Sequence, residues 1–158
     1  MSRTDIIISD KRFQEAIKAI SDAEKDRIYC LHNLEHSVDV ARICYILSLE
    51  SNMNIKKDVI YAAALLHDIG RFKQYQSGIP HQLSSMEIAK ELLPKAGYTE
   101  DEAKEIILAV DCHRNGATKN RLGAILQKAD NLSRLCFDCK AKDTCKWSSD
   151  EMNTELIY

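Results

Sequence analysis

The sequence predicts an all-α protein that folds as a single compact bundle of about six helices. Glycine and proline, which interrupt helices and build hairpin turns, number only five and two among 158 residues. Apolar side chains recur every three or four residues through most of the chain, the spacing that buries one face of a helix. The length suits one domain with one substantial core.

The first half of the chain is expected to form three helices. Residues 11–25 follow Asp10, a residue type that caps helix N-termini, and residues 33–52 repeat apolar side chains at intervals of three and four. Residues 56–69 contain the run VIYAAALLH and stop at Gly70, a residue suited to a left-handed C-terminal cap. Because this third segment is apolar nearly all round, we expect it to be the central buried helix.

Three more helices are expected in the second half. The fourth starts at Pro80, which suits the first turn of a helix, and stops near Pro94 and Gly97. Thr99, followed three residues later by a glutamate, matches the capping box that opens a fifth helix. This helix is expected to run to about residue 113, and the sixth spans roughly residues 119–137.

The chain divides into a helical domain and a tail. Residues 1–135 carry the helical periodicity, whereas residues 136–158 are polar, contain three cysteines and show weaker periodicity. We expect this C-terminal tail to pack on the helical domain or to extend from it.

Composition and charge exclude several classes of protein. The formal net charge of −2 gives no reason to expect a DNA partner, and no uninterrupted apolar run approaches the roughly 20 residues of a membrane span. The first residues lack the pattern of a signal peptide, so we expect a cytoplasmic protein without a membrane partner. Its six cysteines are then expected to be reduced. The sequence does not indicate an oligomeric state.

All five histidines lie between residues 32 and 113. His67 and Asp68 end the most apolar helix, where a buried imidazole and carboxylate would carry a large desolvation cost that a bound dication removes. Imidazole and carboxylate together suit Mn, Fe, Co, Ni or Zn, and are less favourable for Mg. With His36 and Asp130 they would come from three different helices, so a shared ion would also tie the bundle together.

The order of these residues resembles the signature of the HD superfamily of metal-dependent phosphohydrolases. His36 lies in EHSVDVAR, His67 and Asp68 in AALLHDIGRF, and Asp130 in LQKADNLSR. The resemblance covers about residues 30–135. It implies an all-α fold that hydrolyses phosphate esters with one or two divalent metal ions, in which these four residues are the core ligands.

The segment LHNLEHSVDV adds a candidate general acid. It looks like the HNxxH motif of cyclic-nucleotide phosphodiesterases, in which the first histidine protonates the leaving oxygen and the second binds metal. By this resemblance His32 is a catalytic acid, one helical turn from the ligand His36. The alternative is that His32 lies before the helix and only supports the site.

Two further histidines are candidates for a second ion. Resemblance to the dinuclear HD proteins, with the order H, HD, H, H, D, assigns His81 and His113 to a second metal, with Asp68 bridging the two ions. The sequence departs from the HD-GYP subgroup, because Cys112 stands where a neighbouring histidine is expected. The alternative is that both histidines are structural or surface residues.

Cations near the HD motif are candidates for stabilising charge on a phosphate in the transition state. Arg71 and Lys73, directly after HDIG, are the nearest in sequence, with Arg114 and Arg134 as further candidates. Asp39 is expected to be a solvated helix-surface residue.

Three tail cysteines form the pattern C-x2-C-x5-C, one ligand short of a four-cysteine zinc site. Cys30 or Cys112 could complete such a site in space, but the simpler interpretation is a reduced tail with incidental thiols. The three are Cys136, Cys139 and Cys145.

The predicted function is therefore cleavage of a phosphomonoester or phosphodiester, in a small substrate such as a nucleotide, by a metal-activated hydroxide. Two alternatives remain. One is a metal-binding regulatory module that has lost turnover. The other is a di-iron HD oxygenase, which would use a similar ligand set to cleave carbon bonds.

Overall fold

The computed structural model describes residues 1–112 and 120–158. These residues form eight α-helices and two short 3-10 helices, with no strand among them, which confirms the all-α prediction. The elements are α1 (Arg3–Ser9), α2 (Lys11–Glu24), α3 (Leu34–Glu50), α4 (Lys57–Leu66), α5 (Arg71–Ser77), α6 (His81–Lys95), α7 (Glu100–Cys112), α8 (Arg121–Leu132), η1 (Cys136–Asp138) and η2 (Lys142–Thr144).

Helices α1 and α5 were not expected from the sequence. Each has only seven residues, so neither is long enough to show a repeating apolar face. Helix α1 is opened by a capping box, in which the Ser2 hydroxyl accepts from the backbone N–H of Asp5 at 3.1 Å and the Asp5 carboxylate accepts from Ser2 at 2.9 Å. Asp10 separates α1 from α2 and caps α2, as expected.

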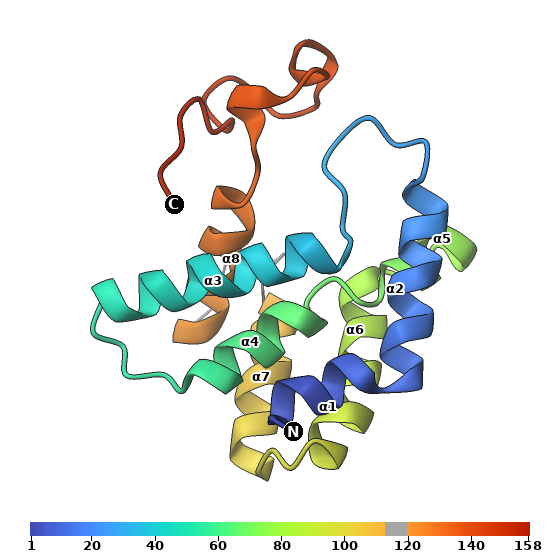
Figure 1. Ribbon diagram of the computed structural model, residues 1–158, viewed down its shortest axis with the longest axis vertical. Helices are drawn as coiled ribbons and strands as arrows, with labels where there is room; N and C mark the ends of the chain where they lie inside the picture. Colours follow the sequence, from blue (N-terminus) through green and yellow to red (C-terminus); the bar gives the residue numbers. More distant parts are fainter. Residues whose placement is uncertain (113–119) are drawn as a thin grey trace.

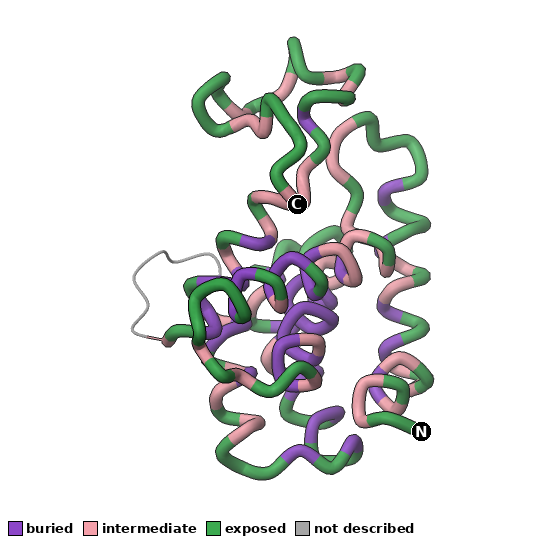
Figure 2. Tube along the Cα trace, turned by 60° about the vertical axis from the view of Figure 1, so that its left-hand side comes forward, coloured by how far each residue is buried: buried purple, intermediate pink, exposed green. Residues whose placement is uncertain are grey.

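Helix α4 is the central buried helix, as predicted. Seven of its residues, Val59, Ile60 and those at 62–66, are buried. Helices α1, α3, α6, α7 and α8 all pack against it, and Figure 2 shows the buried positions concentrated around this centre of the molecule. No helix in the described part of the chain has the length and apolar character needed to cross a membrane.

The helix ends follow the sequence signals with small shifts. Thr99 and Glu102 form the expected capping box at the start of α7. Pro80 is the N-cap of α6 and precedes its first turn, and Pro94 lies inside the last turn of α6. The chain then turns at Gly97, whose φ of 81° is left-handed.

The expected left-handed cap at Gly70 is wrong. Gly70 has a right-handed conformation, with φ −78° and ψ −3°, and is the N-cap of α5. Glycine is required here for a different reason, because a Cβ atom would lie 2.2 Å from the His81 carbonyl oxygen and 2.5 Å from the Ser85 backbone nitrogen. The missing side chain lets α6 approach the turn that carries His67 and Asp68.

Arg3 joins three helices at the end of the bundle opposite the tail. Its Nε donates to Asp58 Oδ2 at 2.7 Å, and its Nη1 donates to Glu102 Oε2 at 2.5 Å. Lys56 Nζ donates to the other Glu102 oxygen at 2.8 Å. These two cations hold the pKa of Glu102 well below its usual range, and Arg3 has the larger effect.

The tail, residues 136–158, lies against the end of α8 and the loop before α3 (Figure 1). Asn153 Nδ2 donates to the carbonyl oxygens of Asn131 and Arg134, both at 2.8 Å. The Tyr29 hydroxyl donates to the Thr144 carbonyl oxygen at 3.1 Å. The tail therefore contacts elements from both halves of the sequence.

Candidate metal centre

His67 and Asp68 lie at the end of the central helix, and both side chains are buried. His67 Nδ1 donates to the Ala64 carbonyl oxygen at 2.7 Å, which directs its Nε2 toward Asp68 Oδ2 at 3.4 Å. The Ser85 hydroxyl donates to the His67 carbonyl oxygen at 3.0 Å and accepts from the Gly70 backbone N–H at 2.9 Å. The turn that carries this pair is therefore fixed by both α4 and α6.

His36 reaches the same point from the first turn of α3. Asn33 caps this helix by accepting from the His36 backbone N–H at 3.0 Å. His36 Nε2 lies 3.9 Å from Asp68 Oδ2, and its imidazole lies 5.5 Å from that of His67 between ring centroids. One ligand atom each from His36, His67 and Asp68 lies within 4.8 Å of the others.

Asp130 completes this group from α8. Its Oδ1 lies 3.3 Å from His36 Nε2 and 3.9 Å from His67 Nε2. The structure thus brings together four residues that are up to 94 positions apart in the sequence, 130 minus 36. We call these four residues the HD cluster: His36, His67, Asp68 and Asp130.

The electrostatics of the HD cluster favour a cation. Burial opposes ionisation of Asp130, but His36 and then His67 outweigh it and hold its pKa at about 2. Burial also opposes protonation of His67, but the Asp68 carboxylate outweighs it and raises the His67 pKa to about 9. Positive charge at this position is therefore stabilised by two carboxylates, and a metal ion can replace the proton.

The HD cluster fits a divalent ion by its donor chemistry as well. Two imidazole nitrogens and two carboxylates are a common ligand set for first-row metals and zinc. The buried Nε2 of His36 has no hydrogen-bond partner among the described residues, although Asp130 lies 3.3 Å away. A metal ion would satisfy this nitrogen.

His81 approaches Asp68 from α6. His81 Nε2 lies 3.2 Å from Asp68 Oδ1, while His67 faces the other oxygen of the same carboxylate. His81 Nδ1 lies 2.6 Å from Gln74 Oε1, which fixes the ring. Among the described residues, the Asp68 carboxylate therefore has the imidazole of His81 at one oxygen and those of His36 and His67 at the other, as a bridging ligand would. His113, the other histidine assigned to a second ion, lies outside the described residues.

His32 lies beside the HD cluster but in the loop before α3. Its Nδ1 lies 2.6 Å from Glu24 Oε1, and its backbone N–H donates to Glu24 Oε2 at 2.7 Å. Its Nε2 lies 4.0 Å from Asp68 Oδ2, so the ring is held by Glu24 on one side and faces the site on the other. Burial lowers the pKa of His32, against the effect of Glu24.

Glu24 supports this arrangement and was not singled out from the sequence. The Tyr75 hydroxyl also donates to it. Burial opposes its ionisation, but the hydrogen bonds from His32 and Tyr75 outweigh this and lower its pKa to about 2. A signal was present, because Glu24 falls at the next apolar position of α2 after Phe13, Ala16 and Ile20.

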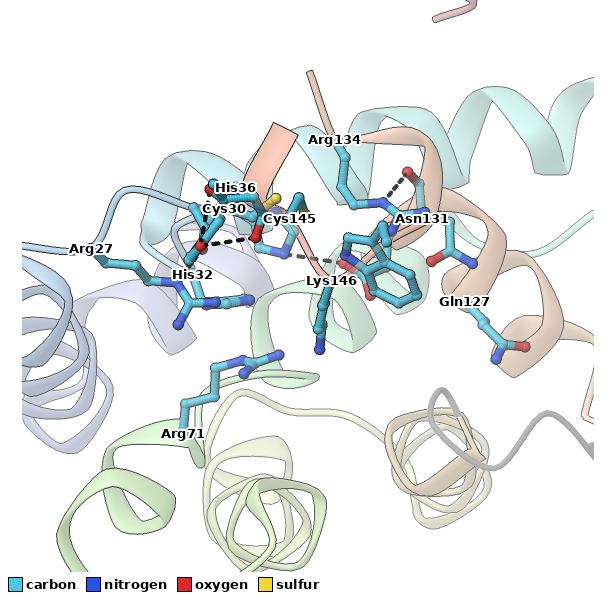
Figure 3. Close-up of a pocket in the computed structure, with 14 residues that line it drawn as sticks. Arg27, Cys30, His32, His36, Arg71, Gln127, Asn131, Arg134, Cys145 and Lys146 are labelled. Carbon is cyan, nitrogen blue, oxygen red and sulfur yellow. Dashed lines mark hydrogen bonds and ion pairs between the residues drawn. The ribbon is translucent and has the colours of Figure 1, made fainter. Parts of the chain in front are cut away.

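A pocket of about 650 Å³ opens over the HD cluster, lined by His32, His36 and Asp130 at one side. Arg71 and Lys146 extend into the same space from α5 and from the tail (Figure 3). Arg71 Nε also lies 2.8 Å from Asp68 Oδ2. The other residues of the wall are Arg27, Tyr29, Cys30, Gln127, Asn131, Arg134, Thr144, Cys145 and Trp147.

Lys73, another cation predicted for the site, lies elsewhere. Lys73 does not line this pocket, and its Nζ lies 2.8 Å from Glu87 Oε2 at the surface. Arg114 lies outside the described residues. Asp39 is partly exposed and pairs with Arg42 at 3.2 Å, consistent with a helix-surface residue. Lys146 and Trp147 of the pocket wall could not be found from the sequence, because the irregular tail has no periodicity to place them.

Comparison with known protein families agrees with this geometry. The family model for the HD domain matches residues 33–135, well over half of the chain, and the matched segment contains all four residues of the HD cluster. The chain belongs to the HD domain family. HD domains are hydrolase domains that bind divalent metals, in keeping with the cluster of His36, His67 and Asp68.

Several other proteins resemble the chain over different lengths. It is 40% identical to an uncharacterised protein of Clostridium beijerinckii, over the whole of both chains. It is 34% identical to the "Putative phosphohydrolase YueE" of Bacillus subtilis, covering 61% of this chain and 63% of that one. It is 32% identical to Ribonuclease Y of Nitratidesulfovibrio vulgaris over 75% of this chain, but spans only 21% of that protein.

A solved structure shares the fold. The crystal structure of a "predicted HD superfamily hydrolase" from an uncultured Thermotogales bacterium superposes with a TM-score of 0.63 and 25% sequence identity. The match covers 96% of this chain and 87% of that one. The prediction of an HD-type helical fold is thereby confirmed.

Proposed function

We propose that this HD protein is a metal-dependent phosphohydrolase that cleaves a phosphomonoester or phosphodiester of a nucleotide. The observation that carries the proposal is the pocket, which is lined by His36 and Asp130 of the HD cluster together with cationic side chains. Two of the relatives have names that describe phosphate ester cleavage, ribonuclease and phosphohydrolase. Their names support the reaction class.

In this proposal His36, His67, Asp68 and Asp130 hold one divalent ion, and His81 and His113 bind a second that shares Asp68. The ion is expected to be Mn, Fe, Co, Ni, Zn or Mg. When bound, such ions supply a nucleophilic oxygen at neutral pH and neutralise charge on the phosphate. The protein contributes a rigid ligand set, since Ala64 and Gln74 hold the imidazoles of His67 and His81, and Asn33 holds the backbone N–H of His36.

Arg71 and Lys146 would bind the non-reacting phosphate oxygens. Arg71 lies on the first turn of α5 and its side chain is mostly buried, so little conformational freedom is lost when it binds a phosphate. Lys146 approaches the same space from the tail (Figure 3). Lys73 is omitted from this proposal because it points away to Glu87.

His32 is proposed to protonate the leaving oxygen through Nε2. Its Nδ1–H donates to Glu24, which keeps the ring oriented and stabilises the imidazolium form. Burial lowers the His32 pKa in the free protein, and the negative charge of a bound phosphate would raise it again. Binding of the substrate would thereby help to charge the acid.

A nucleotide fits the dimensions and lining of the pocket. A volume of about 650 Å³ is within the usual range for small-molecule sites, roughly 300 to 1,000 Å³. Tyr29 and Trp147 provide aromatic surface in the pocket wall, where a base could stack. The Trp147 ring already stacks with Arg134, whose guanidinium carbon lies 4.2 Å from the ring centroid.

The test is a screen of nucleoside mono-, di- and cyclic phosphates and short RNA, with Mn, Ni, Co and Mg added in turn to chelator-treated protein. We expect metal-dependent release of phosphate or of a nucleotide product, abolished by Asp68→Ala. Tight metal binding without turnover on any phosphate ester would instead indicate a regulatory module. Iron retained after anaerobic purification, with oxygen consumption and no phosphatase activity, would indicate an oxygenase.

A further inference from the structure

We propose a further metal site in this chain, separate from the HD cluster: a structural zinc ion held by four cysteine thiolates. The ligands come from the loop before α3 and from the tail, so the ion would fasten these two segments together. The four residues are Cys30, Cys136, Cys139 and Cys145.

The structure selects the fourth ligand that the sequence left open. The three tail cysteines lie on η1 or directly after η1 and η2, and the loop cysteine Cys30 joins them around one pocket of about 390 Å³. Cys112, the other candidate, ends α7 and does not line this pocket. Four cysteines, two of them in a C-x2-C pair, match a closed tetrahedral zinc site.

The thiols are available to a metal ion. All six cysteines of the chain are free, and Cys136 is buried while the other three of the set are partly buried. Burial raises the pKa of the Cys30 thiol, and the neighbouring Cys136 and Cys145 thiols raise it further. The thiol of the loop before α3 and the thiols of the tail are therefore near enough to influence one another electrostatically.

The tail has little buried surface to hold it in place. Among residues 136–158, all of them described, Cys136 is the only buried residue. The only regular structure is two 3-10 helices of three residues each. A segment without a core of its own is usually held by disulfides or a metal, and the disulfides are absent among these cysteines.

Zinc binding would require an inward movement of the ligands. Among the described residues, only the group in the HD cluster places three ligand atoms within 4.8 Å of one another, so the four sulfur atoms must draw closer around the ion. Four thiols would release four protons to solvent as four Zn–S bonds form, which leaves the centre with a net charge of −2. Arg134 and Lys142 line the same pocket and would offset this charge.

The site would also shape the proposed substrate pocket. Cys145 is followed directly by Lys146 and Trp147, and Cys30 lies two residues before His32. All five residues line the larger pocket. This consequence rests on the proposed function, whereas the zinc site itself does not.

The experiment measures zinc in the purified full-length chain by elemental analysis and identifies its ligands by X-ray absorption at the zinc edge. We expect at least one zinc per chain, with sulfur neighbours at about 2.3 Å. Chelator-treated protein reloaded with Co²⁺ should show the intense thiolate charge-transfer bands of a tetrahedral cobalt–sulfur site. These signals should persist in Asp68→Ala, which removes a ligand of the HD cluster.

Two cysteine variants sharpen the test. Cys139→Ser should lose the thiolate-bound zinc, and Cys112→Ser should retain it. Zinc with only nitrogen and oxygen neighbours in the wild-type chain, or equal zinc–sulfur signals in both variants, would overturn the proposal. Because the absorption measurement uses the wild-type chain, misfolding of a variant cannot conceal a negative result, and failure of the phosphatase screen would leave this result unaffected.

Discussion

Replacement of Gly70 by alanine tests how the HD motif is held in place. The added Cβ would lie 2.2 Å from the His81 carbonyl oxygen and 2.5 Å from the Ser85 backbone nitrogen. Ordinary contact begins at 3.4 Å, so the start of α6 would have to recede by about 1.2 Å, 3.4 minus 2.2. Both atoms belong to the backbone, and neither can turn away as a flexible side chain would.

The expected cost is that of an overpacked interior, about 1 to 3 kcal/mol. In a chain of this length each kcal/mol lowers Tm by roughly 2 to 4 °C, so a fall of roughly 2 to 12 °C is expected. The same displacement moves His81, and metal ligands must be placed to within about 0.2 Å. The Gly70→Ala variant should therefore also bind less metal at the side of Asp68 that faces α6.

Gly78→Ala is a matched control for the loss of stability alone. Gly78 has φ 73°, and a Cβ atom added there would meet nothing within 4 Å, so alanine is strained by about 1 to 2 kcal/mol without displacing α6. Urea unfolding and metal titration of both variants separate the effects. Unchanged stability and metal affinity in Gly70→Ala, or an equal loss of metal in both variants, would refute the close-approach argument.

Three further predictions follow from the site and the ion pairs. His32→Ala should lower kcat by about 100- to 10,000-fold on a ribose ester but far less on a p-nitrophenyl ester, with unchanged metal content; equal losses on both substrates would show that His32 only positions the site. Replacing both His81 and His113 by alanine should lower the metal-to-protein ratio while the ion in the HD cluster stays bound. An unchanged ratio would rule out a second ion beside Asp68. Glu102→Gln should lower the free energy of unfolding at neutral pH by roughly 1 to 3 kcal/mol. The folded-state pKa of Glu102 is depressed, so the stability that its charge contributes is fully present above its unfolded pKa and is lost as the pH falls below about 4.5. The free energies of unfolding of wild type and variant, measured in urea, should therefore converge in acid. A difference that stays constant with pH would contradict this origin.

The long helices could be predicted because their periodicity and caps agree. Asp10 and the pair Thr99 and Glu102 begin helices where expected, and the apolar run after residue 56 forms the buried centre. Short helices carry no such periodicity, which is why α1 and α5 were missed. Gly70 was recognised as significant for the wrong reason, because its requirement arises from α6, a segment that approaches only in the tertiary fold.

The candidate site shows the same division between local and distant information. The histidines and aspartates of the HD cluster could be selected by residue type and order, and the structure brings them together. Among the supports of the site, Glu24 could be noticed by its apolar position on α2, but its contact with His32 and that of Gln74 with His81 join different segments, and sequence spacing does not reveal these contacts. The pocket wall formed by Trp147 was equally hidden, because an irregular tail can be placed only by its contacts.

The central claim is that the HD cluster holds a divalent metal ion at the base of the substrate pocket. Anomalous diffraction from crystals grown with Mn²⁺ tests it most directly. The account predicts an anomalous peak in contact with the nitrogen ligands His36 and His67 and the carboxylates of Asp68 and Asp130, at bond lengths of about 2.0 to 2.2 Å. A well-ordered map in which these four side chains contact no anomalous scatterer, at a Mn²⁺ concentration that supports turnover, would contradict it.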